Sequence, residues 1–296
     1  MKTNHIFLVV PALLFTVSCN DNGAGTASGF FEAEEVTVSS EADGRLLKFN
    51  ISQGDVINVG QSVGAVDSTA LFLNRLQLIK SGQSVQSNRP DVELQIKALE
   101  AQLAYQESEQ QRIRRLVEAS AVPAKQLDDI KASINMLKHQ INAQKSVLEG
   151  SVGSIDAQSS AIDIQIALLD DRISKCRLTA PVGGTVLTTY VHQGEFTSTG
   201  RPLYKVANLD EMSLRAYITS DQLAGIRLGQ AVAVKAVFGH EQRDYTGKVT
   251  WISSKSEFTP KNIPTDSERA DMVYAIKIAV QNDGFIKIGT FGQVKF

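Results

Sequence analysis

The chain has few of the residues that stabilise small exported domains. It contains two cysteines, Cys19 and Cys176, in 296 residues, so at most one internal disulfide is possible, and none if Cys19 carries another group. Aromatic residues make up 6% of the chain, with a single tryptophan. So little aromatic bulk argues against one large core and is typical of long, narrow helices and small β modules. The fold must therefore be stabilised by packing alone, with Cys176 as a small buried apolar side chain.

The chain also lacks an excess of charge of either sign. Lys and Arg number 30 against 32 Asp and Glu, and both signs are mixed along the sequence, which excludes the basic footprint of a nucleic-acid-binding protein. Phosphate-binding loops and nucleophile elbows are missing. The histidines are scattered without metal-ligand spacing: His5, His139, His192 and His240. We therefore predict no catalytic residues, no metal and no enzymatic activity.

The N-terminus has the pattern of a targeting segment. Lys2 is followed by an apolar stretch over 6–15, which is too short for a membrane span of about 20 residues. Cys19 comes directly after this stretch, as in a bacterial lipobox, although Thr16 stands where leucine is usual. We expect a lipoprotein signal peptide over 1–19 with Cys19 as the lipid anchor, then a linker over 20–35. The alternative is an ordinary signal peptide with Cys19 incidental.

A sequence repeat surrounds the middle of the chain. Residues 44–66 align without gaps on residues 184–206, at a shift of 140 positions. In each copy a glycine opens a short strand, a Gln-Gly-Asp/Glu turn follows, and another glycine precedes the next strand. We expect the two halves, 36–67 and 175–207, to form one β-sandwich. The turn glycines are Gly44, Gly54, Gly60, Gly184, Gly194 and Gly200.

Residues 68–174, between the two halves, repeat apolar residues at steps of four and three, which predicts coiled-coil helices. The interruption at 118–125 contains Pro123 and predicts the turn of an antiparallel hairpin. Pro90 in one arm faces Gly150 and Gly153 in the other, so we expect a flexible break in both arms. The alternative is a compact helical domain. The seam runs through Val92, Ile96, Leu99, Leu103, Gln106, Gln110, Ile113 and Val117, and returns through Leu127, Ile130, Ile134, Leu137, Ile141, Gln144, Leu148, Ile155, Ser159, Ile162, Ile166, Leu169 and Ile173.

Residues 208–296 read as several short strands separated by turn residues, which predicts a small antiparallel β-barrel. Strands are expected at 212–218, 232–237, 245–252, 272–280 and 285–296. A polar stretch over 257–270 with two prolines is expected to be a long barrel loop.

The split β halves, the hairpin and the barrel together resemble the HlyD-type periplasmic adaptor (membrane fusion protein) family. The residues that carry this resemblance are 42–45, 53–55 and 60–61 in the first half and 179–186 and 193–195 in the second. Residues 257–261 also resemble members associated with ABC exporters. The resemblance implies an elongated α+β fold: a split lipoyl-like β-sandwich carries the long antiparallel hairpin, and the barrel follows.

The resemblance further implies an adaptor that links an inner-membrane transporter to a TolC-type outer-membrane channel, with several copies in a ring. Members paired with RND pumps usually carry another membrane-proximal domain. The short segment between Cys19 and the first β half, and an end at Phe296, leave no material for it, which favours an ABC-type transporter and a periplasmic location at the inner membrane. Lipoyl carriers present a modified lysine, which is missing here. Lys175 is expected to be solvated, and no cofactor is predicted.

The hairpin tip is where this family meets the outer-membrane channel. A frequent tip pattern is Arg, three residues, Leu, six residues, Ser. Arg112 and Leu116 have this spacing, but Pro123 occupies the serine position. The alternative is that Leu116 and Leu127 only close the end of the coiled coil. The candidate tip surface is Arg112, Arg115, Leu116, Ser120, Ala121, Val122, Pro123, Lys125 and Leu127.

Three other functions stay open at the level of sequence. The chain could be the adaptor of another pump class. It could be a lipoyl or biotinyl carrier subunit, against which the missing tip lysine argues. It could also be a coiled-coil lipoprotein that tethers the envelope without transport, which would leave the barrel without an evident use.

Overall fold

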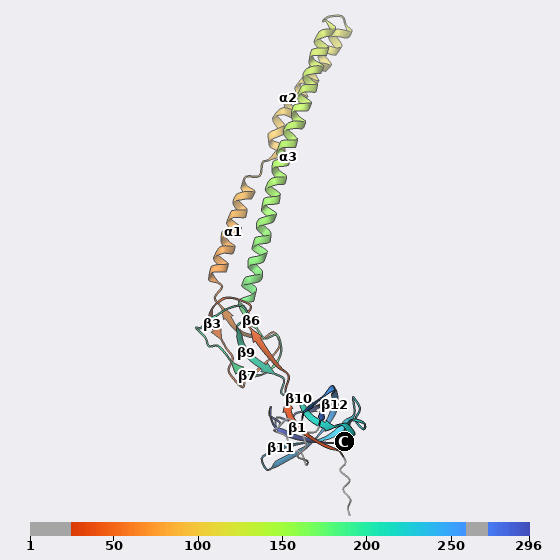
Figure 1. Cartoon of the computed structure of the whole chain (residues 1–296). Helices are drawn as coiled ribbons and strands as arrows, with labels where there is room; N and C mark the ends of the chain where they lie inside the picture. Colours follow the sequence, from red (N-terminus) through yellow and green to blue (C-terminus); the bar gives the residue numbers. More distant parts are fainter. Residues whose placement is uncertain (1–24, 259–271) are drawn as a thin grey trace, which may run out of the picture.

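The computed structural model describes residues 25–258 and 272–296. The expected signal peptide, Cys19 and residues 259–270 of the expected barrel loop lie outside the described residues. A β-barrel, a β-sandwich and a long helical hairpin follow one another along the molecule, and the hairpin extends from the sandwich on the side away from the barrel (Figure 1). This arrangement confirms the predicted α+β fold class.

The β-sandwich consists of two four-stranded sheets built from both halves of the repeat. One sheet has the order β2-β9-β7-β4 and the other β6-β5-β3-β8, so every strand has its repeat counterpart at the same place in the opposite sheet. The two halves are therefore related by a pseudo-two-fold axis. The strands are β2 (Glu35–Ser39), β3 (Gly44–Phe49), β4 (Val56–Ile57), β5 (Ser62–Val66), β6 (Arg177–Thr179), β7 (Gly184–Thr189), β8 (Phe196–Thr197) and β9 (Pro202–Ala207).

The hydrogen bonds of the sandwich repeat at the same shift as the sequence. The Gly54 amide donates to the Val186 carbonyl at 2.8 Å, and the Gly194 amide donates to the Leu46 carbonyl at 2.8 Å. Gly54 and Gly194 have φ angles of 94° and 92°, which disfavour any residue with a side chain. The predicted glycine turns thus form a matched pair that joins the two sheets.

The hairpin consists of an ascending arm, α1 (Thr69–Ser87) and α2 (Val92–Glu118), and a returning arm, α3 (Ala124–Lys175). The predicted seam positions are buried or half-buried with the exception of Gln144, which is exposed. Three ion pairs join the arms: Arg75–Asp170 (2.5 Å), Arg89–Asp156 (3.0 Å) and Lys138–Glu107 (2.9 Å). The antiparallel pairing predicted from the heptads is therefore the observed one.

The expectation of facing breaks in both arms is wrong for the returning arm. Only the ascending arm is interrupted, at 88–91, where Pro90 cannot continue a helix and Asp91 caps α2 by accepting a hydrogen bond from the Leu94 amide at 2.9 Å. The α3 helix continues through Gly150 and Gly153. Glycine lowers helix stability by about 1 kcal/mol per residue but leaves the hydrogen bonds intact, so a long helix tolerates it.

Strand β1 and the C-terminal strands form a closed antiparallel barrel of six strands in the order β1-β10-β13-β12-β11-β14. The strands are β1 (Thr26–Glu32), β10 (Glu211–Thr219), β11 (Ala231–Phe238), β12 (Glu241–Phe258), β13 (Met272–Gln281) and β14 (Phe291–Lys295), and α4 (Ser220–Leu223) follows β10. The expected strand at 285–296 is shorter than predicted, because a loop occupies 285–290 before β14 begins.

Residues 20–35 were expected to be a linker, but part of this range forms strand β1. This strand pairs with β10 on one side and β14 on the other and closes the barrel. Its alternating pattern buries Ala27 and Phe31, and Gly29 allows close approach, because a Cβ there would lie 1.8 Å from the Arg215 carbonyl oxygen. The chain thus enters the barrel, leaves it for the sandwich and hairpin, and returns.

Candidate functional site

At the hairpin tip five residues, 119–123, separate the end of α2 from the start of α3. The Ala121 amide donates to the Leu116 carbonyl at 2.8 Å and the Ser120 amide to the Val117 carbonyl at 2.9 Å, which is the Schellman arrangement. Ser120 has a φ of 50°, the one positive value of a non-glycine residue within 25–258 and 272–296. Pro123 precedes the first residue of α3 with a φ of −65°, which suits a helix start. The tip is therefore a defined turn.

The predicted tip residues divide into apolar closure and exposed polar surface. Leu116, Val122 and Leu127 are half-buried, which fits closure of the coiled-coil end. The remaining predicted residues are exposed: Arg112, Arg115, Ser120, Ala121, Pro123 and Lys125. The Arg112 guanidinium donates hydrogen bonds to the Glu109 carboxylate, 2.7 Å away, and these raise the pKa of Arg112. The tip thus presents cations and small side chains around a half-buried apolar centre.

Lys175 lies at the C-terminal end of α3, where the hairpin rejoins the sandwich. Its ammonium group lies 2.8 Å from the Asp171 carboxylate, and this hydrogen bond raises the pKa of Lys175. Its position is the end of a helix and not a hairpin tip between two strands, so it does not have the placement of a carrier lysine. Cys176, the next residue, is buried, and burial raises the pKa of its thiol.

A cavity of about 320 Å³ lies between the edge strands β2 and β6 at the base of α3. Val38 and Leu178 line it as repeat counterparts, and so do Val63 and Leu203, which places the cavity on the pseudo-two-fold axis. Tyr204, whose repeat counterpart is Gly64, also lines it. The Tyr204 hydroxyl is buried without a hydrogen-bond partner among the described residues, and burial raises its pKa. In the sequence, the available signal for this cavity was the mismatch of Tyr204 with Gly64.

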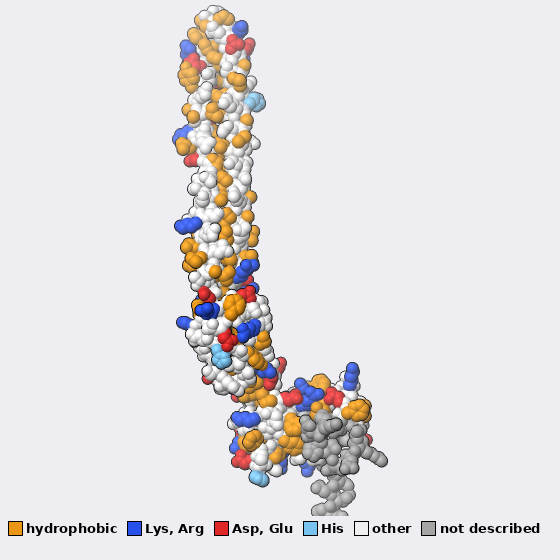
Figure 2. Space-filling view, turned by 60° about the vertical axis from the view of Figure 1, so that its left-hand side comes forward, with side chains coloured by type: hydrophobic (Ala, Val, Ile, Leu, Met, Phe, Trp, Pro, Cys, Tyr) orange, Lys and Arg blue, Asp and Glu red, His pale blue; other side chains and the backbone are white. Residues whose placement is uncertain are grey.

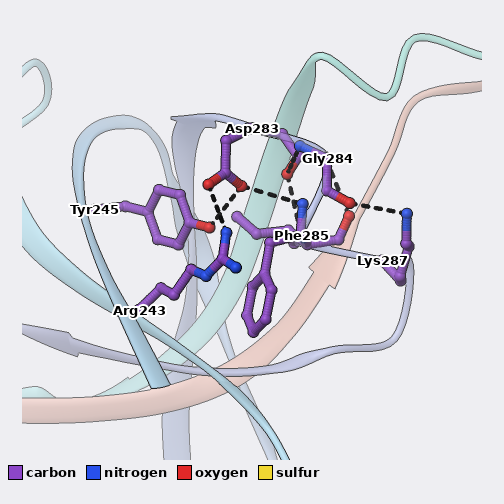
Figure 3. Close-up of polar contacts among 8 residues, drawn as sticks. Arg243, Tyr245, Asp283, Gly284, Phe285 and Lys287 are labelled. Atoms are coloured by element: carbon purple, nitrogen blue, oxygen red, sulfur yellow. Dashed lines mark hydrogen bonds and ion pairs between the residues drawn. The ribbon is translucent and has the colours of Figure 1, made fainter. Parts of the chain in front are cut away.

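A polar cluster at one end of the barrel was missed by the sequence analysis (Figure 3). Arg243 and Tyr245 on β12 both contact the Asp283 carboxylate, at 2.9 and 2.8 Å. The Arg243 guanidinium lies 4.1 Å from the Phe285 ring centroid, and Phe285 in turn lies edge-on to the exposed Phe238. The Phe285 amide and the Tyr245 hydroxyl lower the pKa of Asp283. The Asn282-Asp283-Gly284 turn was the available signal.

Two classes of site are missing from the described part of the chain. Between residues 25 and 258 and from 272 onward, no helix has the length and apolar character needed to cross a bilayer. The same residues hold no group of three or more His, Cys, Asp or Glu side chains that could bind a metal ion. The remaining candidates are surfaces: the tip, the flanks of the hairpin and the end of the barrel.

A β-sandwich assembled from two halves, a coiled-coil hairpin inserted between them and a barrel built from both ends of the chain define an elongated adaptor. Residues 34–208 match the sequence model described as "RND MFP, barrel-sandwich hybrid domain". The chain therefore belongs to the periplasmic adaptor, or membrane fusion protein, family, whose members are non-enzymatic.

The chain is also similar to curated proteins along most of its length. It is 27% identical over 289 residues to a "UPF0194 membrane protein" of Citrobacter koseri, which covers 89% of this chain and 85% of that protein. It is 27% identical over 301 residues to the "UPF0194 membrane protein YbhG" of Salmonella gallinarum, at 94% and 90% coverage.

Solved structures share the fold at low sequence identity. MacA from Actinobacillus actinomycetemcomitans matches with a TM-score of 0.56 and 20% identity over 92% of this chain and 78% of that chain. The membrane fusion protein Spr0693 from Streptococcus pneumoniae R6 matches with a TM-score of 0.56 and 16% identity over 91% and 98%. These likenesses support the adaptor fold and leave the transporter class open.

Proposed function

We propose that this protein is the periplasmic adaptor of an export system, linking an inner-membrane transporter to a TolC-type outer-membrane channel. The observation that carries the proposal is the hairpin: α3 alone has 52 residues, about 78 Å of helix at 1.5 Å per residue. A defined tip thus lies far from a barrel at the opposite end of the molecule. A molecule of this shape suits contact with two partners in different membranes.

In this function the two ends have different partners. The tip contacts the channel through Arg112, Arg115 and Lys125 around Leu116 and Val122. The barrel contacts the transporter, with Phe238 and Phe285 at one end of it. A lipid on Cys19 holds the barrel at the inner membrane, and several copies assemble into a ring. The transporter is of the ABC type, which the resemblance of residues 257–261 to members associated with ABC exporters favours.

A second transporter class is favoured by one finding. The matched family model carries RND in its description, so a proton-driven RND pump is the alternative partner. The two classes differ in what a crosslink from the barrel captures: an ABC-type partner brings an ATPase subunit, and an RND pump does not.

Site-specific photocrosslinking in cells tests the bridge. A photoreactive residue at the exposed Ala121 is expected to capture an outer-membrane channel, and one at the exposed Phe238 an inner-membrane transporter, identified by mass spectrometry. A probe at Asn142, exposed in the middle of α3, is the matched control and is expected to capture neither. Capture of the same membrane's proteins from both ends, or of none, would contradict the adaptor function and favour an envelope tether.

A further inference from the structure

The cavity between β2 and β6 has a buried apolar floor. Val63, Leu178, Leu203 and Tyr204 line it, and all four side chains are buried. They come from both sheets of the sandwich, because β5 and β6 belong to one sheet and β9 to the other. The volume of about 320 Å³ lies at the lower end of the range of ligand pockets, about 300–1,000 Å³. A floor of this kind suits the apolar body of a small molecule.

The rim of the cavity is exposed and charged. Glu41, Lys175 and Arg177 line it there. The Asp171 carboxylate, 2.8 Å from the Lys175 ammonium, and the Glu41 carboxylate both raise the pKa of Lys175, so both acidic groups act on this one cation. Arg177 has no ion-pair partner among residues 25–258 and 272–296. The rim therefore offers the Arg177 guanidinium to an anion from outside the chain.

The floor holds a hydrogen-bond donor that the fold leaves unused. Tyr204 is 0% exposed, and its hydroxyl has no partner among the described residues. A buried hydroxyl without a partner lowers the stability of the folded state, whereas phenylalanine would supply the same ring at no such cost. Buried polar groups are nearly always paired, so an unpaired donor beside a cavity indicates a partner that the chain itself does not supply.

These two donors break the pseudo-two-fold symmetry of the cavity. The apolar lining comes in repeat pairs, as expected for a hollow on the axis between the two halves. The repeat counterparts of Arg177 and Tyr204 are Thr37 and Gly64, and neither of these lines the cavity. The repeat therefore accounts for the hollow but not for its donors, which belong to this one position in the molecule.

The cavity lies where the hairpin joins the sandwich. Ser174 and Lys175, the last residues of α3, line it together with residues 177–179 of β6. On the face drawn in Figure 2, charged side chains of both signs gather at this junction, and few are seen along the middle of the hairpin. A molecule in the cavity contacts the end of α3 and strands of both sheets. Its binding therefore stiffens the base of the hairpin.

We propose that this cavity binds a small organic carboxylate, with its apolar body against Leu178, Leu203 and the ring of Tyr204 and its carboxylate at Arg177. A planar guanidinium can donate two parallel hydrogen bonds to a carboxylate, which a neutral ligand cannot accept in the same way. The Tyr204 hydroxyl donates to a second acceptor on the bound molecule. This ligand site goes beyond the proposed function and does not depend on its membrane partners.

Isothermal titration calorimetry on the full chain in detergent tests the anion contact. The probes are benzoate, naphthoate and naphthamide, the last being the neutral counterpart of naphthoate. We expect naphthoate to bind about tenfold more tightly than naphthamide. Arg177→Gln should remove this preference, and Arg45→Gln, the matched control at an exposed arginine of β3 outside the cavity, should keep it. Failure of both carboxylates to bind, or an equal loss of preference in the two variants, would overturn the proposal.

Tyr204→Phe tests the floor while keeping the ring. We expect the native chain to bind hydroxynaphthoate about threefold more tightly than naphthoate, and Tyr204→Phe to lose this difference without unfolding at a lower urea concentration. Naphthoate should also slow hydrogen exchange in peptides that cover 174–181 and 202–206, but not in the barrel. Protection confined to other parts of the chain, or a hydroxyl preference that survives in Tyr204→Phe, would show that the named contacts are wrong.

Discussion

The glycines of the sandwich offer a prediction with an internal control, because each has a counterpart in the other half of the repeat. Gly54 and Gly194 have φ angles of 94° and 92°, and a Cβ at either meets no heavy atom of the described chain within 4 Å. Gly184 has a φ of 144°, and a Cβ there lies 2.4 Å from the Ala207 carbonyl oxygen. At Gly44 the nearest atom is the Val66 side chain, at 2.8 Å.

These distances separate backbone strain from steric clash. Alanine at Gly54 or Gly194 introduces strain alone, about 1–2 kcal/mol. At Gly44 a side chain must also move, so we expect about 2–3 kcal/mol. At Gly184 the obstacle is the neighbouring strand β9, which cannot move without disturbing the sheet, so we expect about 4 kcal/mol or more. The predicted order of destabilisation is Gly184, then Gly44, then Gly54 and Gly194 together.

Hydrogen exchange followed by mass spectrometry measures this order locally, because peptides from β7 and β9 report the opening free energy of the sandwich separately from the hairpin and barrel. Gly54→Ala and Gly194→Ala are expected to agree within about 0.5 kcal/mol. A loss at Gly54→Ala as large as that at Gly184→Ala would refute the steric reasoning. Unequal losses at Gly54 and Gly194 would show that the two halves are alike in geometry but not in energy.

Three further substitutions have defined outcomes. Tyr204→Phe removes a buried hydroxyl without a described partner, so urea titration at pH 8 should show an unfolding free energy that is unchanged or higher by up to about 1 kcal/mol. Because burial raises the pKa of Tyr204, the native chain should lose stability above pH ~10, and the Tyr204→Phe variant should not show this loss. Asp283→Asn should lower the Tm of the barrel at pH 7, followed by Trp251 fluorescence, and the difference from the native chain should shrink as the pH is lowered. The pKa of Asp283 is lowered, so its stabilisation is complete above the unfolded pKa of about 3.9 and is lost as the pH falls through the lower folded pKa. Gly153→Ala should slow hydrogen exchange in α3 by an amount equivalent to about 1 kcal/mol, and faster exchange there would contradict a straight α3.

The parts of the fold that repeat in sequence were the ones that could be predicted in most detail. The alignment of the two copies placed Gly54 opposite Gly194, and the structure pairs them in matched hydrogen bonds. The heptads placed the hairpin seam correctly because seam burial depends only on local spacing. Strand β1 could not be placed in the same way. Its residues alternate, but their partners in β10 and β14 lie near the other end of the chain: Ser28 pairs with Tyr217 on one side and with Gln293 on the other.

Contacts between distant single residues were equally hidden. Arg243 and Asp283 are 40 positions apart, and only the closed barrel brings them together. The buried Tyr204 hydroxyl, which has no described partner, was hidden as well, because the counterpart position in the other half of the repeat holds Gly64. For the tip, the sequence indicated the turn but not the positive φ of Ser120, since glycine or asparagine is the usual residue there.

The interruption of the ascending arm changes neither the height nor the phase of the coiled coil. In the ion pairs Arg75–Asp170 below it and Glu107–Lys138 above it the two residue numbers add up to 245, so α2 resumes at the height that an unbroken helix would have reached. The half-buried Val85 and Val92 are also one heptad apart. The lasting effect of 88–91 is therefore a local loss of helical hydrogen bonds.

A joint at this level matters only if the returning arm can bend beside it. By the same relation Gly150 and Gly153 are level with positions 95 and 92, at the start of α2, and neither glycine is required by packing within the described chain. Both arms therefore resist bending least at this one level, and the hairpin is stiffer below it and above it. A tilt at this level turns the tip while the lower part of the hairpin keeps its place on the sandwich, so the tip can be reoriented towards a partner.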